Sequence, residues 1–271
     1  MKVKRVAAFV LCCMLIFTAV SCDSGKENGQ GGERKSVSML FNGNSFVFTG
    51  EVPEQLRNIC SMYGIDIEYK DRSTGNAELS MISLPTLTRI FQNEEYDYFV
   101  IQDYGTKPGT EEFFNDVKAL CDLAKQYAVK PILYNPAWVN IKDENGNPMP
   151  DEDTQQFFTE AYEKAAEDNG AVLVNAGDAW VYQYRVNPQS DLYKAVDDYH
   201  ANDEGAYLTA CVFASTLFNL HIKDEDKGNI YKGNNSIALG QSAWEFVTYY
   251  NEHKAIPEKA VEVPDGSNKK F

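Results

Sequence analysis

Basic residues are scarce in this sequence. Its 25 lysines and arginines stand against 40 aspartates and glutamates, which gives a formal net charge of −15. A surface with this excess of negative charge repels nucleic acids and anionic lipids. Neutral glycans or cationic partners suit it better, so we expect no nucleic-acid partner.

Histidine and cysteine are rare as well. The sequence holds three histidines and six cysteines. Beyond residue 22 the cysteines stand in three separate apolar segments, at Cys60, Cys121 and Cys211. Scattered histidines and cysteines do not form the ligand set of a zinc site, and the apolar settings predict buried thiols without a disulfide framework. We therefore expect no metal and no organic cofactor.

A long apolar run is found at the start of the chain. Val6 to Val20 follows a basic segment and leads into Ala19-Val20-Ser21-Cys22. A run this short suits the core of a signal peptide better than a spanning helix, which needs ~20 residues. The pattern predicts a lipoprotein signal peptide over residues 1–21, with Cys22 as the lipidated first residue of the mature chain. An ordinary secretory signal or an uncleaved anchor is the alternative.

Cleavage after residue 21 removes three basic residues and no acid, which takes the net charge from −15 to −18. The next segment is rich in glycine and charge and lacks hydrophobic residues, so residues 22–35 are predicted as a flexible tether. One domain is predicted over residues 36–255 and a loose tail over 256–271. We expect a monomer that is anchored by lipid in the cell envelope, at the periplasmic face or the cell surface.

Strand-like and helix-like segments alternate within the predicted domain. The expected strands are 37–41, 65–69, 96–102, 131–134 and 171–175, and the expected helices are 52–63, 79–91, 110–127, 154–169 and 206–220. The segment 145–150 is predicted as a surface loop. This alternation predicts an α/β fold, a three-layer α/β/α sandwich around a mainly parallel five-stranded sheet. In such sheets the functional site lies at the carboxyl ends of the strands.

The first expected strand breaks at Asn42-Gly43-Asn44 and leaves Ser45 at the break. A hydroxyl is a poor nucleophile, so it needs an exposed position, a neighbouring base and hydrogen-bond donors for the oxyanion. A corner between a strand and a helix supplies the position and the donors. Ser45 is therefore the candidate nucleophile, although Asn-Gly-Asn-Ser is also common turn chemistry.

His200 is the candidate base among the three histidines. It lies in a loop just before an expected helix, with Asp197 three residues upstream. This spacing lets the carboxylate hold one imidazole nitrogen while the other faces a serine. Asp198 could substitute for Asp197, or either acid could cap the helix. His221 and His253 are interpreted as structural.

These residues carry a resemblance to a known family. Gly43-Asn44-Ser45 early in the domain, followed late by Asp197-x-x-His200, resembles the SGNH (GDSL-like) hydrolases, and in particular a Gly-Asn-Ser-Phe branch. The resemblance implies a catalytic triad of Ser45, His200 and Asp197, with oxyanion donors from Ser45, Gly75 and Gln102. The family's Gly-x-Asn-Asp block is absent here, and Tyr104 stands where the branch usually has a second glutamine.

Together with this resemblance, the sequence predicts a serine esterase of the SGNH type that cleaves small O-acyl groups, chiefly O-acetyl, on neutral carbohydrate. Aromatic residues after expected strand ends, Tyr104, Trp138 and Trp180, are candidates for stacking on sugars. The alternative is a lipid-tethered glycan-binding protein with an idle triad on the same fold. An α/β-hydrolase is disfavoured because Gly-x-Ser-x-Gly is absent around Ser45.

Overall fold

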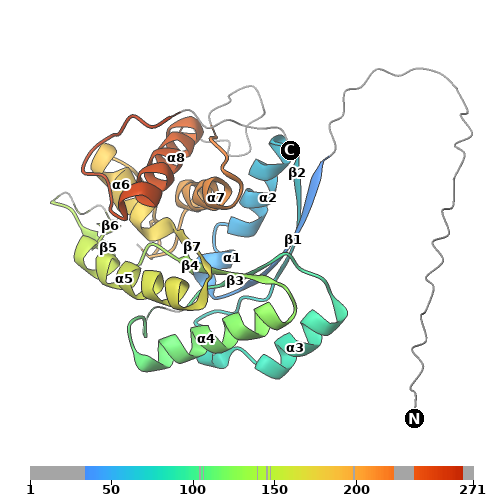
Figure 1. Cartoon of the computed structure of the whole chain (residues 1–271). Coiled ribbons are helices and arrows are strands. Elements are labelled where there is room, and N and C mark those ends of the chain that lie inside the picture. The colour runs from blue at the N-terminus through green and yellow to red at the C-terminus, as the bar shows by residue number, and fades with distance from the viewer. Residues whose placement is uncertain are drawn as a thin grey trace, which may run out of the picture. The chain divides into compact units, whose positions relative to one another are not determined.

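A five-stranded sheet forms the centre of the molecule in this computed structural model (Figure 1). The strand order is β2-β1-β3-β4-β7 and every pairing is parallel. The strands are β1 (Lys35–Asn42), β2 (Ile65–Asp71), β3 (Tyr98–Ile101), β4 (Lys130–Asn135) and β7 (Val172–Asn175). The structure describes residues 34–103, 105, 107–138, 140–144, 146, 148–197, 199–222 and 235–264.

The burial of the strands follows from their places in the sheet. β1 lies inside it, and its last four residues are all buried because both faces are covered. β2 lies at an edge, where Ile65 and Ile67 are buried while Asp66 and Glu68 are exposed. β1 and β3 are neighbours, although the chain leaves β1 toward β2 on the other side. This reversal of strand order opens a crevice at their carboxyl ends, where α/β sheets bind ligands.

Three helices cover one face of the sheet. They are α3 (Leu84–Asn93), α4 (Glu111–Gln126) and α5 (Glu152–Asn169), and their apolar side chains form one core cluster with that face. The sequence predicted one helix over 79–91, but the structure has a short 3-10 helix, η1 (Leu79–Met81), before α3. The break arises because Pro85 has no amide hydrogen and is therefore accommodated in the first turn of a helix, where Ser83 caps α3 by accepting from the Thr86 amide.

The opposite face is covered by α2 (Val52–Met62), α6 (Ala176–Val186) and α7 (Asp203–Phe218), with α8 (Ser236–His253) packed on α7 and α6 (Figure 1). α7 is buried on almost every side because it lies between the sheet and α8. The predicted three-layer α/β/α architecture is confirmed. The prediction did not include α6 or α8.

Two further segments differ from their sequence predictions. Part of the expected loop 145–150 is a strand, β6 (Pro148–Pro150), which pairs with β5 (Asn140–Lys142) in a small antiparallel sheet. Residues 256–264 of the expected loose tail are held to the domain. The Arg185 guanidinium donates to the carbonyls of Ile256 and Pro257, and the Trp244 indole donates to that of Pro264.

The expected signal peptide, Cys22 and most of the tether lie outside the described residues. The tether's end already belongs to the domain, since Arg34 pairs with Asp66 of β2. None of the helices that the structure describes is long and apolar enough to cross a membrane. Cys60, Cys121 and Cys211 are buried free thiols, as predicted.

Candidate active site

Ser45 is the first residue of a one-turn helix, α1 (Ser45–Phe48), which follows the carboxyl end of β1. Asn44 caps this turn, because its side-chain oxygen accepts from the Phe46 amide at 3.1 Å. Asn44 is fully buried while Ser45 is partly exposed. The cap therefore fixes the backbone below the serine, and the hydroxyl remains accessible at the carboxyl edge of the sheet.

His200 and Asp197 lie beside this serine, although they are 155 and 152 residues further along the chain. The distance from His200 Nε2 to Ser45 Oγ is 2.8 Å, and the distance from His200 Nδ1 to Asp197 Oδ2 is also 2.8 Å. The structure thus brings together the three residues that the sequence singled out. Their order is that of a nucleophile, a base and an orienting acid.

Hydrogen bonds to Asp197 favour its charged form. Partial burial alone would raise the pKa of this carboxyl group, but the backbone amides of His200 and Tyr199 and the His200 ring all donate to it, and the net result is a lowered pKa. A carboxylate at Nδ1 requires the proton of a neutral imidazole to be on that nitrogen. Nε2 is then free to accept a proton from Ser45.

The suggestion that an acid of this loop caps α7 does not apply to Asp197. The cap of α7 is Asn202, whose side-chain oxygen accepts from the Gly205 amide at 3.0 Å. Asp197 is engaged with His200 and Tyr199 instead. Asp198 lies outside the described residues.

Gln102 is placed differently from the expected oxyanion donor. It follows β3 and is 1% exposed, and its Oε1 accepts from the Asn44 amide at 2.9 Å. Its Nε2 donates to the carbonyl of Asp103. Both ends of the carboxamide thus serve backbone groups, and these partners also fix which end is oxygen. In this arrangement Gln102 supports the turn that carries Ser45.

Asp103 ties together the two loops that follow β2 and β3. Its carboxylate is buried and accepts from the amides of Leu79 and Gly105, at 3.0 and 3.3 Å. The Asn44 side chain adds a third connection, by donating to the carbonyl of Ala77 at 3.3 Å. Nothing in the sequence marks Asp103, because a single aspartate after a strand has no distinguishing pattern. The turn of residues 42–45, which carries the candidate nucleophile, is called the nucleophile turn below. These buried bonds hold this turn and both loops in one arrangement.

Gly75 lies in the loop after β2, close to the nucleophile turn. The loop continues the parallel pairing, since the Thr74 amide donates to the carbonyl of Gly43 at 3.0 Å. Gly75 itself is exposed. The amide of Ser45 has no hydrogen-bond partner among the described residues, as is normal for the first turn of a helix. The amides of Ser45 and Gly75 are thus the candidate oxyanion donors that remain.

Trp138 lies beside the candidate triad. Its ring packs against Phe46 and Tyr199, with centroids 5.0 and 5.7 Å apart, and it is partly exposed. A side chain at Gly105 would overlap this ring, because a Cβ there would lie 2.6 Å from it. Tyr199 completes the wall with its ring 5.0 Å from that of His200. Tyr199 was missed in the sequence, where its position next to His200 was the available signal.

Trp180 is wrongly predicted as a substrate-binding residue. It is 3% exposed, and its indole nitrogen donates to Thr209 on α7. Its ring packs on Tyr193 and on the backbone of Gly205. Trp180 belongs to α6, which packs against α7, so its ring lies in the core. Tyr104 lies outside the described residues.

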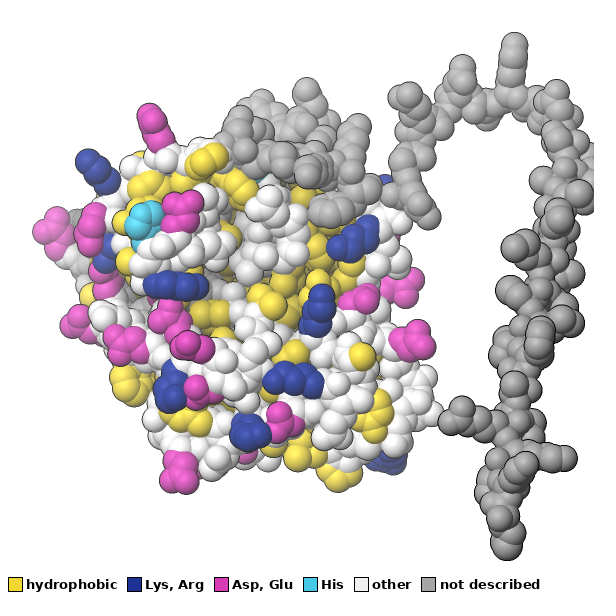
Figure 2. Space-filling view, viewed as in Figure 1, with side chains coloured by type: hydrophobic (Ala, Val, Ile, Leu, Met, Phe, Trp, Pro, Cys, Tyr) yellow, Lys and Arg dark blue, Asp and Glu magenta, His cyan; other side chains and the backbone are white. Residues whose placement is uncertain are grey.

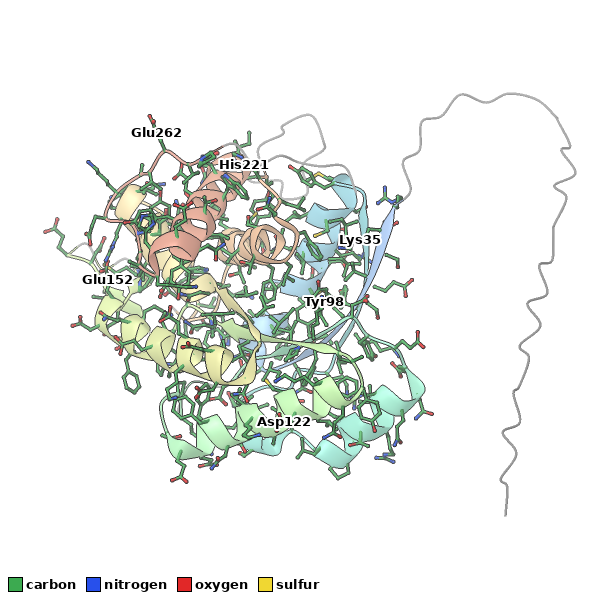
Figure 3. All side chains as sticks on the ribbon, viewed as in Figure 1. Lys35, Tyr98, Asp122, Glu152, His221 and Glu262 are labelled. Carbon is green, nitrogen blue, oxygen red and sulfur yellow. The ribbon has the colours of Figure 1, made fainter. Side chains whose placement is uncertain are left out.

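The other two histidines have structural contacts away from Ser45. His221, labelled in Figure 3, is buried. It stacks on Trp244 of α8 and bonds to Gln241. His253 stacks on Tyr249 in the last turn of α8. In the part of the chain that the structure describes, no group of three or more histidines, cysteines or acids could hold a metal ion.

The fold has relatives among solved structures. No protein-family model matches the sequence, and no curated protein matches it. A DUF4886 family protein from Bacteroides uniformis is similar over 79% of this chain and 96% of its own, with 15% identity and a TM-score of 0.66. The acetyl xylan esterase AlAXEase is 19% identical over 67% of this chain and 100% of its own, with a TM-score of 0.52.

The structure of TesA is also similar, with 16% identity, a TM-score of 0.50, and 67% of this chain and 98% of its own covered. The fold is thus similar to those of TesA and of this acetyl xylan esterase. At these identities the likeness concerns the fold alone. In this fold, Ser45 follows β1, an inner strand of the sheet, and His200 precedes α7.

Proposed function

We propose that this protein is a serine esterase that cleaves small O-acyl esters, chiefly O-acetyl esters on carbohydrate. The observation that carries the proposal is the hydrogen-bonded chain from Ser45 through His200 to Asp197, with 2.8 Å at both links. These three hydrogen-bonded residues lie at the carboxyl edge of the sheet, beside the crevice between β1 and β3. A structural role alone does not require an accessible serine at the end of such a chain.

The reaction follows from this geometry. Ser45 Oγ attacks the acyl carbon while His200 Nε2 takes its proton, and the carbonyl oxygen becomes an oxyanion held by the amides of Ser45 and Gly75. The tetrahedral intermediate collapses, and His200 returns the proton to the leaving alcohol. Water then attacks the acyl-serine with His200 as base, which releases the acid and restores Ser45. Asp197 keeps the imidazole in the required tautomer throughout.

The substrate class is proposed from the surroundings of Ser45. Trp138 and Tyr199 present partly exposed rings beside the triad, and aromatic faces are suited to stacking on sugars. An acetyl xylan esterase is among the proteins with a similar fold. One chain supplies every group that the reaction needs, so the proposal includes no metal, cofactor or second subunit.

The test compares the purified full chain with Ser45→Ala on p-nitrophenyl acetate and on esters of longer acids. We expect turnover that depends on Ser45, with kcat/KM highest for acetyl, because a shallow cleft leaves the methylenes of a longer acyl chain in water and does not gain the ~0.8 kcal/mol that each buried methylene contributes. Ser36→Ala is the matched control, since Ser36 is an exposed serine at the far end of β1. If kcat/KM is highest for octanoyl or longer esters, the proposed deacetylase activity is wrong, while the proposed mechanism at Ser45 is unaffected.

A glycan-binding protein with an idle triad remains the second candidate. The position of Gln102 favours it, because Oε1 accepts from the Asn44 amide and Nε2 already donates to the carbonyl of Asp103, which leaves one N–H for an oxyanion. Loss of such a donor typically lowers the rate by ~10²–10³. Saturable binding of a glycan without Ser45-dependent turnover would select this alternative.

A further inference from the structure

A cavity of about 280 Å³ lies beside the nucleophile turn, between that turn and the start of α3. Asn42 and Gly43 line it from the turn, and Thr74 and Gly75 line it from the loop after β2. Its volume suits one sugar ring or one short acid better than a large ligand. A substrate whose ester lies at Ser45 thus has this cavity next to its reacting end.

Arg72 is the charged residue of this cavity, since the other described residues that line it are polar or apolar. The residue directly follows β2, and its amide donates to the carbonyl of Phe41 at 2.9 Å. Alternate residues of β2 face the same side, so Arg72 projects with Lys70 toward α3. The N-terminus of α3 also lines the cavity, and the partial positive charge of its amides favours a bound anion.

The charge of Arg72 is not neutralised by an ion pair. No salt bridge joins it to any described residue, and the neighbouring acids have partners of their own. Glu94 pairs with Lys70 at 2.7 Å, and Glu78 pairs with Lys107 at 2.8 Å. The Asp71 carboxylate accepts from the Ser73 amide at 2.8 Å. The pKa of Glu94 is lowered chiefly by its hydrogen bond with Lys70 and to a smaller extent by the charge of Arg72. No salt bridge among the described residues joins Glu94 to Arg72, so the guanidinium keeps its donors for a ligand in this cavity.

We propose that Arg72 binds a carboxylate of the ester substrate in this cavity. The inference rests on the proposed function and narrows it to esters that carry a negative charge near the acyl group. A guanidinium recognises a carboxylate through two parallel hydrogen bonds. The overall negative charge acts weakly here, because salt screens interactions beyond about 8–10 Å at physiological ionic strength. The carboxylate can belong to the alcohol, as in an acetylated uronic acid, or to the acyl group, as in a hemisuccinate.

The test uses two matched pairs of esters and the full chain. Acetylated methyl glucuronoside is compared with acetylated methyl glucoside, and p-nitrophenyl hemisuccinate with p-nitrophenyl butyrate. For each pair we take the kcat/KM of the charged ester divided by that of the neutral ester. We expect Arg72→Gln to lower this ratio about tenfold in one of the two pairs, because a partly hydrated bidentate ion pair is lost. The pair that responds identifies the side of the ester that carries the carboxylate. Arg72→Lys should give an intermediate ratio.

Arg89→Gln is the matched control, because Arg89 is an exposed arginine of α3 outside the cavity lining and its loss changes the net charge equally. Its ratios should equal those of the unmodified protein. If neither ratio responds to Arg72→Gln in a protein that still unfolds cooperatively, the assignment of Arg72 is wrong.

A binding measurement separates this inference from the proposed function. Glucuronate and succinate are titrated calorimetrically into Ser45→Ala, and into the double variant that also carries Arg72→Gln. Binding of one acid that is lost in the double variant supports the cavity even if no ester is turned over, in which case only the esterase proposal fails. Turnover that depends on Ser45, without binding or ratios that depend on Arg72, overturns the cavity alone.

Discussion

Asp197 illustrates how a single carboxylate is prepared for one partner. Two backbone amides donate to Oδ1, and the imidazole of His200 meets Oδ2. The amides hold the side chain still, so the acid orients the ring instead of moving with it. This fixed geometry makes the three residues of the candidate triad one unit.

We expect Ser45→Ala and His200→Ala to lower kcat to a similar extent, by roughly 10⁴-fold or more, and the double variant to be no worse than either. Asp197→Ala should retain more activity than these two, because the imidazole can still accept a proton without its orienting acid. Asp198→Ala should be mild. Steady-state kinetics on p-nitrophenyl acetate measures all of these, and equal damage from Asp198→Ala and Asp197→Ala would show that the acid is misassigned.

Asp178 is a second buried acid, and it lies in a polar cluster away from Ser45. It is 3% exposed and accepts from the hydroxyl of Thr159 at 2.6 Å and from the Asn175 side chain at 2.7 Å. Burial raises the pKa of this group to about 7, and the two hydrogen bonds only partly offset that rise. Since the folded state holds the proton more tightly than the unfolded state, the stabilisation is complete below about pH 4 and is lost as the pH rises to about 7.

The Asp178→Asn variant should therefore change the pH dependence of stability. Asparagine stays neutral, so the free energy of unfolding of the native protein should fall relative to the variant by roughly 4 kcal/mol between pH 4 and pH 8. Urea unfolding at both pH values measures this. Asp122→Asn on the solvent face of α4 (Figure 3) is the control. A hydrogen bond from Lys118 lowers the pKa of Asp122, so any effect there has the opposite sign.

The sequence identified Ser45, Asp197 and His200 because local patterns mark them, a strand that breaks at a turn and an acid three residues before a histidine. It did not identify what Gln102 or Trp180 would touch. The direction of a carboxamide depends on which amide lies opposite it, here that of Asn44. The burial of Trp180 depends on α7, which packs over it from a distant part of the chain.

At the scale of elements, the nucleophile turn depends on the absence of a side chain at Gly43. A Cβ there would lie 2.6 Å from Gln102 Oε1 and 2.9 Å from Val47 Cγ2. Either Gln102 or α1 would have to move, and the bond from Asn44 to Gln102 would be strained or lost. The turn and the loop after β3 thus fit together only with glycine at this position.

Gly43→Ala should lower both stability and kcat. Overpacking of this kind costs about 1–3 kcal/mol, which corresponds to a fall in Tm of several degrees in a domain of this size. Gly75→Ala is the comparison for stability, because nothing lies within 4 Å of a Cβ at Gly75. Thermal unfolding of both variants tests the packing argument, and similar Tm values for the two would contradict it.

Most elements were predictable because their residues follow a single periodicity. The inner strands β1, β3 and β4 are short and mostly buried runs, and α2 and α4 have one apolar face each. The missed helix α6 is buried over nearly its whole length, so no polar face marks its period. The break between η1 and α3 could have been predicted from Pro85, whereas the pairing of β5 with β6 depends on tertiary contacts.

At the scale of the whole molecule, acidic and basic side chains are interspersed over the visible face (Figure 2).

We propose that the chain is exported and held in the cell envelope by lipid on Cys22, on the basis of the apolar run and Ala19-Val20-Ser21-Cys22. Cys22→Ser should then release the protein from membranes and abolish the incorporation of labelled palmitate. Membrane fractionation tests this. The proposal is wrong if the Cys22→Ser protein still sediments with membranes and still takes up the label.

The long separation between Ser45 and His200 also has a consequence for the timing of activity. During synthesis the serine leaves the ribosome 155 residues before its base, and a hydroxyl without a base is a weak nucleophile. On the proposed mechanism, a growing chain carries an inert serine until the segment before α7 packs on the domain and places the imidazole of His200 beside it. On the proposed mechanism, turnover requires that His200 has reached Ser45, and a fragment that ends before residue 200 should be inactive.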